Sequence, residues 1–328
     1  MSAAPPASSS ASSEVRARAG QARPAITAVV VTHNRPRLLR TVLDALHRQV
    51  RPPDRVIVVD NASDVPTTAM LALLRASGDC GVFDVLRSER NLGGAGGFAM
   101  GLQAACHGGA DWAWLLDDDA VPRADALCAL ESAAARAGPG CGAVCGAVHE
   151  FGRLARGHRR SYGRFAGLER ALPRTAYAGA PVRIGTGSFV GFMVAATAVA
   201  RIGLPEPTFF LSYDDTDYSL RLRRAGFALW LAPASVIDHL RSAGGRLRAG
   251  PVGAKHYFNI RNRIITARRH AACPRLAAAL GALTGVALWL ACSGRFRPGA
   301  CAIVRRALLD GWRGRLGPYP PEHASRHP

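Results

Sequence analysis

Trp112-Ala-Trp-Leu-Leu-Asp117-Asp118-Asp119-Ala-Val-Pro122 is the stretch of sequence that decides the fold. Its five leading apolar residues predict a buried strand, and three consecutive carboxylates follow where that strand ends. Neighbouring negative charges repel one another unless a cation or solvent compensates them, and hard divalent cations prefer oxygen ligands. In open α/β sheets the ligand binds beyond the carboxyl ends of the strands. The stretch therefore predicts a site for a metal-bound, phosphorylated ligand, with a solvated acidic turn as the alternative.

Three apolar segments precede this strand and alternate with segments of helical spacing. Strands are expected over residues 26–31, 55–59 and 82–86, with a helix after each of the first two. After the third, a glycine-rich loop over residues 91–97 leads into another helix. Such alternation of strands and helices predicts an α/β fold with a doubly wound, mostly parallel sheet.

The second half of the chain is less regular. The small residues between Gly185 and Val194 would let a ligand approach a strand closely. A glycine- and arginine-rich stretch before it is typical of a segment on the surface. The elements expected here are a surface excursion over residues 152–174, a strand over 185–194, a helix over 219–225 and short strands over 228–231 and 236–237.

Polar loops suited to a nucleotide follow the strands of the first half. The carboxyl ends of parallel strands meet at one edge of a sheet, so we expect these side chains to lie close together. The carboxylate of Asp60 could accept from a base N–H or a ribose hydroxyl, and the glycines at a helix start offer backbone N–H groups to a diphosphate. The residues concerned are Thr32, Asn34, Arg35, Asp60, Asn61, Asn91, Gly93 and Gly94.

A second acidic cluster, Asp214-Asp215-x-Asp217, lies before a predicted helix. Aspartate favours helix starts, and Asp217 is expected to do only that. A general base, however, also requires a carboxylate held beside a polar site. His239 follows a predicted pair of strands and could return to the same face, and imidazole with carboxylates suits Mn²⁺. We therefore expect the two acidic clusters to converge with His239 around one cation, with a purely structural histidine as the alternative.

The glycine loop also fits a different enzyme class. Gly94-x-Gly96-x-x-Ala99 matches the dinucleotide-binding fingerprint, and Asp117 follows at about the required distance. That fingerprint normally sits on the first strand of its fold, whereas two strand–helix units precede it here. Three acids also exceed what one ribose needs. A NAD-dependent dehydrogenase is therefore the remote alternative.

The C-terminal region carries most of the excess positive charge. The chain has a formal net charge of +19, and residues 241–328 hold 15 arginines and one lysine against Asp310 and Glu322. Such asymmetry indicates an anionic partner. Because no aromatic residues interleave with the basic ones in a recognisable module, we expect no nucleic acid and favour an anionic membrane surface. The uncharged segment 276–294 could span the membrane, lie on it or pack within the protein.

The N-terminal residues and the cysteines place the protein in the cytoplasm. Residues 1–24 are rich in Ala, Ser and Pro and lack the apolar core of a signal peptide, so a disordered tail is expected. The eight cysteines are scattered, and Cys141 and Cys145 lack the partner pair of a zinc site. They are typical of small buried side chains in a reducing compartment.

The succession of motifs over residues 25–240 resembles family 2 inverting glycosyltransferases of the GT-A fold. Within that family the chain looks most like actinobacterial galactofuranosyltransferases of cell-wall galactan synthesis, and related rhamnosyltransferases share much of the pattern. The motifs that carry the resemblance are Val29-Val-Val-Thr-His-Asn-Arg35, Val58-Val-Asp-Asn-Ala-Ser63, Asn91-Leu-Gly-Gly94, Asp117-Asp-Asp119, Asp214-Asp-x-Asp-Tyr-x-Leu-x-x-Arg223 and His256-Tyr-Phe-x-x-Arg-Asn262.

The resemblance implies a role for each acidic residue. Asp60 contacts the nucleotide base, and Asp118 the donor ribose or sugar. Asp215 is the general base, and Asp214 orients the acceptor. The metal ligands for Mn²⁺ or Mg²⁺ are Asp117, Asp119 and His239. Some relatives carry a tryptophan pair at the acceptor site, where this chain has Ser188-Phe189-Val190.

The resemblance further implies transfer of galactofuranose from UDP-galactofuranose to a polyprenyl-diphosphate-linked saccharide, at the inner face of the plasma membrane. The alternatives are rhamnosyl transfer from dTDP-rhamnose and a non-catalytic protein that binds a sugar nucleotide. The donor half is expected over about residues 25–122 and the acceptor half over about residues 140–240. Residues 241–328 are expected to form a basic, helical, membrane-associating region.

Overall fold

The computed structural model describes residues 23–241, 247, 252–292 and 299–319. The predicted N-terminal tail lies outside the described residues, except for its last two.

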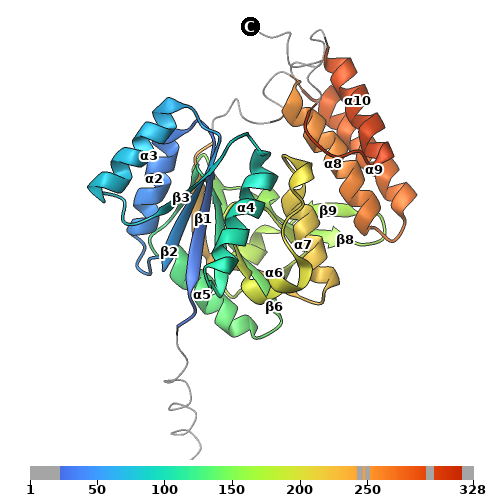
Figure 1. The fold of residues 1–328 in the computed structure, drawn as a ribbon. Coiled ribbons are helices and arrows are strands. Elements are labelled where there is room, and N and C mark those ends of the chain that lie inside the picture. The colour runs from blue at the N-terminus through green and yellow to red at the C-terminus, as the bar shows by residue number, and fades with distance from the viewer. Residues whose placement is uncertain (1–22, 242–246, 248–251, 293–298, 320–328) are drawn as a thin grey trace, which may run out of the picture.

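A ten-stranded mixed sheet forms the centre of the molecule (Figure 1), with the main strand order β10-β13-β6-β12-β4-β1-β2-β3. Strands β4, β1, β2 and β3 are mutually parallel, and β6 pairs in parallel with β13. Strand β12 lies antiparallel between β4 and β6 and joins the two halves. The strands are β1 (Ile26–Thr32), β2 (Arg55–Asn61), β3 (Asp84–Ser88), β4 (Trp112–Asp117), β5 (Ala120–Pro122), β6 (Cys141–Glu150), β7 (Arg153–Leu154), β8 (Arg159–Gly163), β9 (Leu168–Ala171), β10 (Val182–Ile184), β11 (Thr186–Gly187), β12 (Phe192–Ala195) and β13 (Ala228–His239).

Helices cover both faces of this sheet. Successive residues of β1 point to opposite faces. Val30 packs in the core beneath α2, α3 and α5, and Val29 packs in the core beneath α4, α6 and α7. Because both faces are covered, all seven residues of β1 are buried. The predicted α/β class with a doubly wound, mostly parallel sheet is therefore confirmed. The helices are α2 (Pro36–His47), α3 (Val65–Ser77), α4 (Gly93–His107), α5 (Ala126–Ala137), α6 (Ala196–Ile202), α7 (Asp214–Arg224), α8 (Ala254–His270), α9 (Pro274–Leu290) and α10 (Ala300–Arg313), with 3₁₀ turns η1 (Arg156–His158), η2 (Arg174–Tyr177) and η3 (Pro207–Phe209).

The segment expected as a surface excursion is an ordered part of the fold. Strands β8, β9 and β11 form a separate three-stranded sheet. Arg159 at the start of β8 is fully buried, and its guanidinium donates to the backbone carbonyls of Gly146 and Val190 at 2.8 and 2.6 Å. A buried arginine that donates to carbonyls of neighbouring segments ties the hairpin to the main sheet, which hydrophobic periodicity alone does not reveal.

Three predicted boundaries in the second half differ from the structure. The strand expected over residues 185–194 is broken, because the chain leaves β11 and turns at Gly191, whose φ is +70°, before β12. The two short strands are one strand, β13, with a register shift between Ala232 and Val236. Helix α7 begins at Asp214 rather than Ser219, so that all three acids of the second cluster stand on its first turn.

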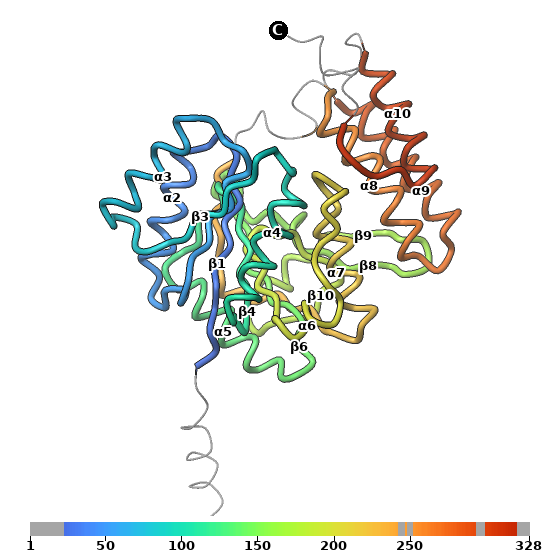
Figure 2. The backbone as a smooth tube through the Cα atoms, in the orientation of Figure 1, coloured from blue at the N-terminus to red at the C-terminus, as the bar shows by residue number. Residues whose placement is uncertain are grey.

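The C-terminal helices form a third core beside the β8–β9 hairpin (Figures 1 and 2). The tip of the hairpin is bonded to the turn between α8 and α9, since the amide of Ala272 donates to the carbonyl of Arg164 at 2.8 Å. Helix α9 buries small residues such as Gly281 and Gly285 but exposes Leu276 and Leu283. Among the helices of the described residues, none combines the length and the apolar character that crossing a bilayer requires.

Candidate active site

The end of β4 brings the three consecutive aspartates onto the predicted sheet edge, next to the end of β1. Asp118 is buried and accepts from the Thr32 hydroxyl at 2.8 Å. The Arg35 guanidinium bridges two carboxylates, at 3.2 Å from Asp118 Oδ1 and 2.8 Å from Asp119 Oδ2. Asp117 occupies the last position of β4.

His239, the last residue of β13, completes the acidic cluster. Its Nε2 atom lies 3.1 Å from Asp119 Oδ1, and its Nδ1 atom lies 3.1 Å from Glu150 Oε1. The ligand atoms of Asp117, Asp119 and His239 all lie within 4.8 Å of one another. Because β13 runs parallel to β6 and pairs with β5, the fold itself returns His239 to the carboxylates.

This cluster fits a divalent cation such as Mn²⁺ or Mg²⁺. Two carboxylates and one imidazole are a suitable donor set for a hard or borderline ion. Asp119 Oδ1 is buried and has no hydrogen bond of acceptable geometry within the described residues, which leaves that oxygen available to an ion. A proton on Nδ1 of His239, donated to Glu150, would direct the Nε2 lone pair toward the aspartates.

Burial and mutual repulsion shift the acids of this cluster in different directions. Burial, followed by the charges of Asp119 and Asp118, raises the pKa of Asp117 to about 7. Burial also raises the pKa of Asp118, to about 6. Although burial opposes the change, the close approach and charge of His239, together with Arg35, lower the pKa of Asp119. The site therefore holds more acid than its own cations neutralise, which favours an additional cation.

The polar residues after β2 and β3 form a connected network. The Asn61 amide donates to the Asn91 side chain at 3.1 Å and to the carbonyl of Gly93 at 3.0 Å. Asp60 accepts from the guanidinium of Arg87, and Asn34 Oδ1 accepts from the backbone of Asp64 at 2.8 Å. Together with Thr32, Arg35, Gly94 and Asp117–Asp119, these residues make up what we call the donor edge.

Gly93 connects the donor edge to the loop before α7. Its φ is +69°, and a Cβ atom there would lie 2.0 Å from the carbonyl oxygen of Phe210. The amide of Ala95 donates to that same carbonyl at 3.2 Å. A Cβ on Gly94, by contrast, would meet nothing within 4 Å, so its face of the helix start is open. The two glycines therefore have different roles: Gly93 lets the backbone of Phe210 pack closely against the helix start, and Gly94 leaves open space beside it.

The loop before α7 is strained and is held from α8. Phe210, Ser212 and Tyr213 have φ values of +64°, +67° and +69°, a region that non-glycine residues rarely adopt. The Asn262 amide, fully buried, donates to the carbonyls of Phe209, Leu211 and Ser212 at 2.8–3.0 Å. This contact, which we call the Asn262 clamp, fixes the loop that presents Asp214 and Asp215.

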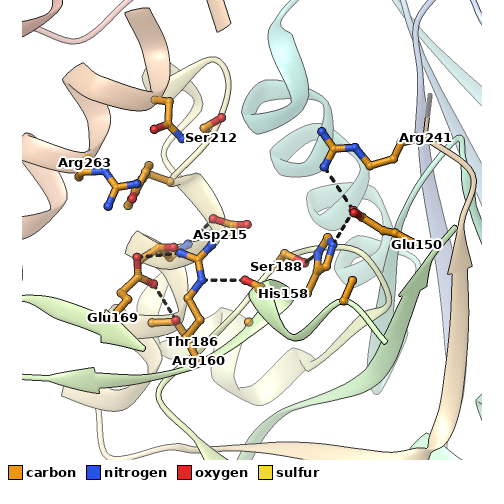
Figure 3. Close-up of a pocket in the computed structure, with 16 residues that line it drawn as sticks. Glu150, His158, Arg160, Glu169, Thr186, Ser188, Ser212, Asp215, Arg241 and Arg263 are labelled. Carbon is orange, nitrogen blue, oxygen red and sulfur yellow. Dashed lines mark hydrogen bonds and ion pairs between the residues drawn. The ribbon is translucent and has the colours of Figure 1, made fainter. Parts of the chain in front are cut away.

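Asp215 faces a cavity of about 460 Å³, shown in Figure 3. We call it the Asp215 cavity. Burial raises the pKa of Asp215, and the nearby Arg160 opposes that shift. Burial and the charge of Asp215 also raise the pKa of Asp214, and the charge of Asp117 contributes. The side chains that line the cavity include Glu150, His158, Arg160, Glu169, Ser188, Ser212, Tyr213, Asp215, Arg241 and Arg263.

Glu150 lies between the acidic cluster and this cavity. It lines the cavity and accepts at Oε1 from His158 and Arg241 at 3.1 and 3.2 Å (Figure 3). The same oxygen also accepts from His239 at 3.1 Å. The hydrogen bond from His158, assisted by Arg241, lowers the pKa of Glu150 to about 2. Glu150 therefore contacts the acidic cluster through His239 and also lines the cavity that Asp215 faces. Asp214 and Asp215 are not members of the cluster formed by Asp117, Asp119 and His239, so the prediction that both acidic clusters converge around one cation is wrong: α7 presents Asp215 to the cavity instead.

Sequence reasoning missed several lining residues and two side-chain contacts. Glu150 ends a buried strand, so the signal that found Asp60 and Asp117 would also have found it. Asp217 lies in the first turn of α7, as expected, and in addition its carboxylate contacts His270 Nε2 at 2.8 Å in a buried pair that the sequence did not indicate. Phe189 packs against Phe98 in the core, with ring centroids 5.0 Å apart, and does not line the cavity.

Comparisons with known proteins agree with this architecture. The family model described as Glycosyl transferase family 2 matches residues 27–197. Galactofuranosyltransferase GlfT1 of Mycobacterium tuberculosis is 35% identical over 257 residues, which cover 73% of this chain and 80% of the relative. Galactofuranosyltransferase GlfT1 of Mycolicibacterium smegmatis is 34% identical over 254 residues, with 73% and 81% covered.

Solved structures of similar fold are glycosyltransferases. GalNAc-T7 with UDP, GalNAc and Mn²⁺ has a TM-score of 0.59 at 16% identity, with 74% of this chain and 47% of that one covered. The mannosyltransferase PcManGT from Pyrobaculum calidifontis, in complex with GDP-Man and Mn²⁺, has a TM-score of 0.54 at 16% identity, with 90% and 87% covered. At these identities the likeness shows the fold alone. The family model and the identity to GlfT1 show more than the fold: the chain is a glycosyltransferase that belongs to glycosyl transferase family 2.

Proposed function

We propose that the enzyme transfers galactofuranose from UDP-galactofuranose to a polyprenyl-diphosphate-linked saccharide, with inversion at the anomeric carbon. The identity to GlfT1 over 73% of the chain supports the sugar. The observation that supports the chemistry is that Glu150 contacts His239 of the acidic cluster and also lines the Asp215 cavity, so that the two lie side by side.

The donor edge would bind the nucleotide. Asp60 is proposed to contact the base and Asp118 the ribose or sugar, while the open start of α4 at Gly94 would offer N–H groups to the diphosphate. Asp117, Asp119 and His239 would hold Mn²⁺ or Mg²⁺. When bound, that ion would neutralise charge on the departing diphosphate.

Asp215 is the proposed general base. It would take the proton from the acceptor hydroxyl while that oxygen bonds to the anomeric carbon and the nucleoside diphosphate leaves from the opposite side. Asp214 would orient the acceptor. The Asp215 cavity supports this assignment, because it is large enough for a sugar ring and most of its lining residues belong to the acceptor half of the chain, about residues 140–240. Residues 25–122 would form the donor half.

Residues 241–328 are proposed to rest on an anionic membrane at the inner face of the plasma membrane. Leu276, Leu283 and Leu290 recur every seven residues on α9 and are 44%, 65% and 55% exposed. Arg275 on α9 and Arg305 on α10 are also exposed. Exposed apolar side chains flanked by arginine suit an interfacial helix that delivers the enzyme to a lipid-linked acceptor.

A donor screen tests this function. The purified enzyme is incubated with membrane extract as acceptor, Mn²⁺ or Mg²⁺, and either UDP-galactofuranose or dTDP-rhamnose, followed by linkage analysis of the product. We expect transfer only from UDP-galactofuranose, and its loss on chelation. Transfer from dTDP-rhamnose would establish the rhamnosyltransferase alternative. Binding of a donor without transfer to any acceptor would identify a non-catalytic sugar-nucleotide-binding protein.

A further inference from the structure

A second, smaller cavity opens behind the Asp215 cavity, between the β8–β9 hairpin and helices α8 and α9. We call it the hairpin cavity; its volume is about 120 Å³. The two cavities share four wall residues, so the second lies directly beside the first. The shared residues are Glu169, Tyr213, Thr216 and Arg263.

Four polar side-chain atoms on the wall of the hairpin cavity are buried without a hydrogen-bond partner in the described part of the chain. They are Tyr162 Oη, Tyr213 Oη, Arg263 Nε and Thr266 Oγ1. Thr266 is only 2% exposed and Tyr213 only 7%. Buried polar groups of native proteins nearly always have partners, because an unsatisfied group carries its full desolvation penalty. Four of them around one cavity indicate a polar occupant.

The chemistry of the wall indicates what kind of occupant it takes. Three hydroxyls can donate and accept, and the guanidinium Nε–H of Arg263 can donate. The carboxylate of Glu169 pairs with Arg160 at 2.9 Å, and the guanidinium of Arg263 lies over the ring of Tyr213 at 5.2 Å from its centroid, so each charged group of the wall already has a favourable neighbour. Leu168 and Leu280 add apolar surface beside these groups. Alternating hydroxyls and C–H faces are the surface of a neutral sugar ring.

Small residues of α9 keep the hairpin cavity open. Ala277 and Gly281 line it, and a Cβ on Gly281 would lie 3.6 Å from the side chain of Arg263, in ordinary contact. An added methyl group is therefore tolerated by the fold but reduces the space. Because α8 and α9 supply half of the wall, the C-terminal helices take part in this cavity directly.

We propose that the hairpin cavity is the subsite for the second sugar ring of the acceptor, next to the ring whose hydroxyl meets Asp215. The inference rests on the proposed function and deepens it: the enzyme distinguishes a disaccharide acceptor from a monosaccharide by hydroxyl contacts to Tyr162, Tyr213 and Thr266. Selectivity of this kind arises because the buried polar groups of the protein remain without hydrogen-bond partners when the acceptor lacks its second sugar ring.

The test compares two soluble acceptors, octyl β-galactofuranoside and the corresponding octyl digalactofuranoside. Calorimetric titration in the presence of UDP and Mn²⁺ gives the ratio of their affinities. We expect the wild-type enzyme to bind the disaccharide about ten-fold more tightly, and Thr266→Val to reduce that ratio about three- to ten-fold. The melting temperature of this variant should stay unchanged or rise, because a methyl group replaces an unpaired buried hydroxyl.

Thr67→Val is the matched control. Thr67 on α3 is also fully buried with an unpaired hydroxyl, but it does not line either cavity. It should leave the affinity ratio unchanged. Should Thr266→Val fail to fold, Gly281→Ala provides the same test, since alanine favours the helix while its methyl group narrows the cavity.

The outcomes separate this inference from the proposed function. Equal binding of the two glycosides, binding of neither, or an unchanged ratio in the folded variant overturns the subsite, even if galactofuranose is transferred. A ratio that falls as expected, in an enzyme that transfers no galactofuranose from UDP-galactofuranose, supports the subsite and rejects the proposed donor.

Discussion

The donor edge and the acceptor side of this enzyme are built in opposite ways. On the donor edge, Asp118 accepts from Thr32 and Arg35, and Asn61 bonds to Asn91 and Gly93, so the side chains hold one another in place. Around the hairpin cavity, hydroxyls such as that of Thr266 have no partner within the described residues. The first region is arranged before its ligand arrives, whereas the second leaves polar groups for the ligand to satisfy.

The largest expected effect is a loss of turnover without a loss of nucleotide binding. Asp215→Asn removes the proposed base but keeps the shape of the side chain, so kcat should fall by about 10²–10⁴-fold. UDP binding, measured by titration, should be unchanged because the donor edge is intact. A parallel loss of UDP affinity would mean that Asp215 belongs to the donor site instead.

Glu150→Gln tests the link between the regions. Its carboxylate accepts from His239 Nδ1, and loss of such a partner typically weakens metal binding about 10–100-fold. The Mn²⁺ concentration for half-maximal activity should rise accordingly, and excess Mn²⁺ should restore the rate. Glu89→Gln, at an exposed position, serves as the control. An unchanged Mn²⁺ requirement would show that Glu150 does not act through His239.

The Asn262 clamp offers a smaller effect on catalysis. Asn262→Ala removes the two N–H donors that the three carbonyls of the strained loop share, each hydrogen bond being worth about 1 kcal/mol. We expect the free energy of unfolding to fall by about 2 kcal/mol and kcat by roughly ten-fold, because Asp215 is no longer held in place. KM for the donor should not change. A variant that is less stable but fully active would limit Asn262 to a structural role.

The smallest effect concerns the membrane. Leu283→Gln removes one exposed apolar side chain from α9, and binding to vesicles that contain anionic lipid should weaken roughly three- to ten-fold. Activity on a soluble acceptor should be unaffected. Val82→Gln, which changes an even more exposed apolar residue far from α9, should leave vesicle binding intact. Equal weakening by both variants would argue against a specific membrane face.

The same contrast explains what the sequence could predict. Thr32, Asp60 and Asp117 each end an apolar strand, so their place on one edge follows from strand periodicity and from the geometry of parallel sheets. Glu150 carried the same signal and was overlooked. Arg160 and Glu169 lie on a hairpin without apolar alternation, and its pairing with β11 and its attachment to the main sheet through Arg159 give them a place in the site.

The residue at which α7 begins could not be predicted from the sequence for a different reason. The residues that turn the chain into the helix, Phe210, Ser212 and Tyr213, have positive φ values but are not glycines. Their conformation is imposed by Asn262, about fifty positions away in sequence, and local propensity contains no trace of it. Tertiary contacts of this kind are what a single sequence does not disclose.

Helix α8 serves two purposes at once, because Asn262 secures the loop that carries the proposed base and Thr266, one turn later, belongs to the wall of the hairpin cavity. A protein truncated at residue 240 to obtain a minimal catalytic domain would therefore still bind its nucleotide but would bind the acceptor poorly. Conversely, grafting α8 and α9 from one family member onto another should carry acceptor preference along with it, so that new glycan specificities can arise by exchange of a C-terminal module while the nucleotide site stays untouched.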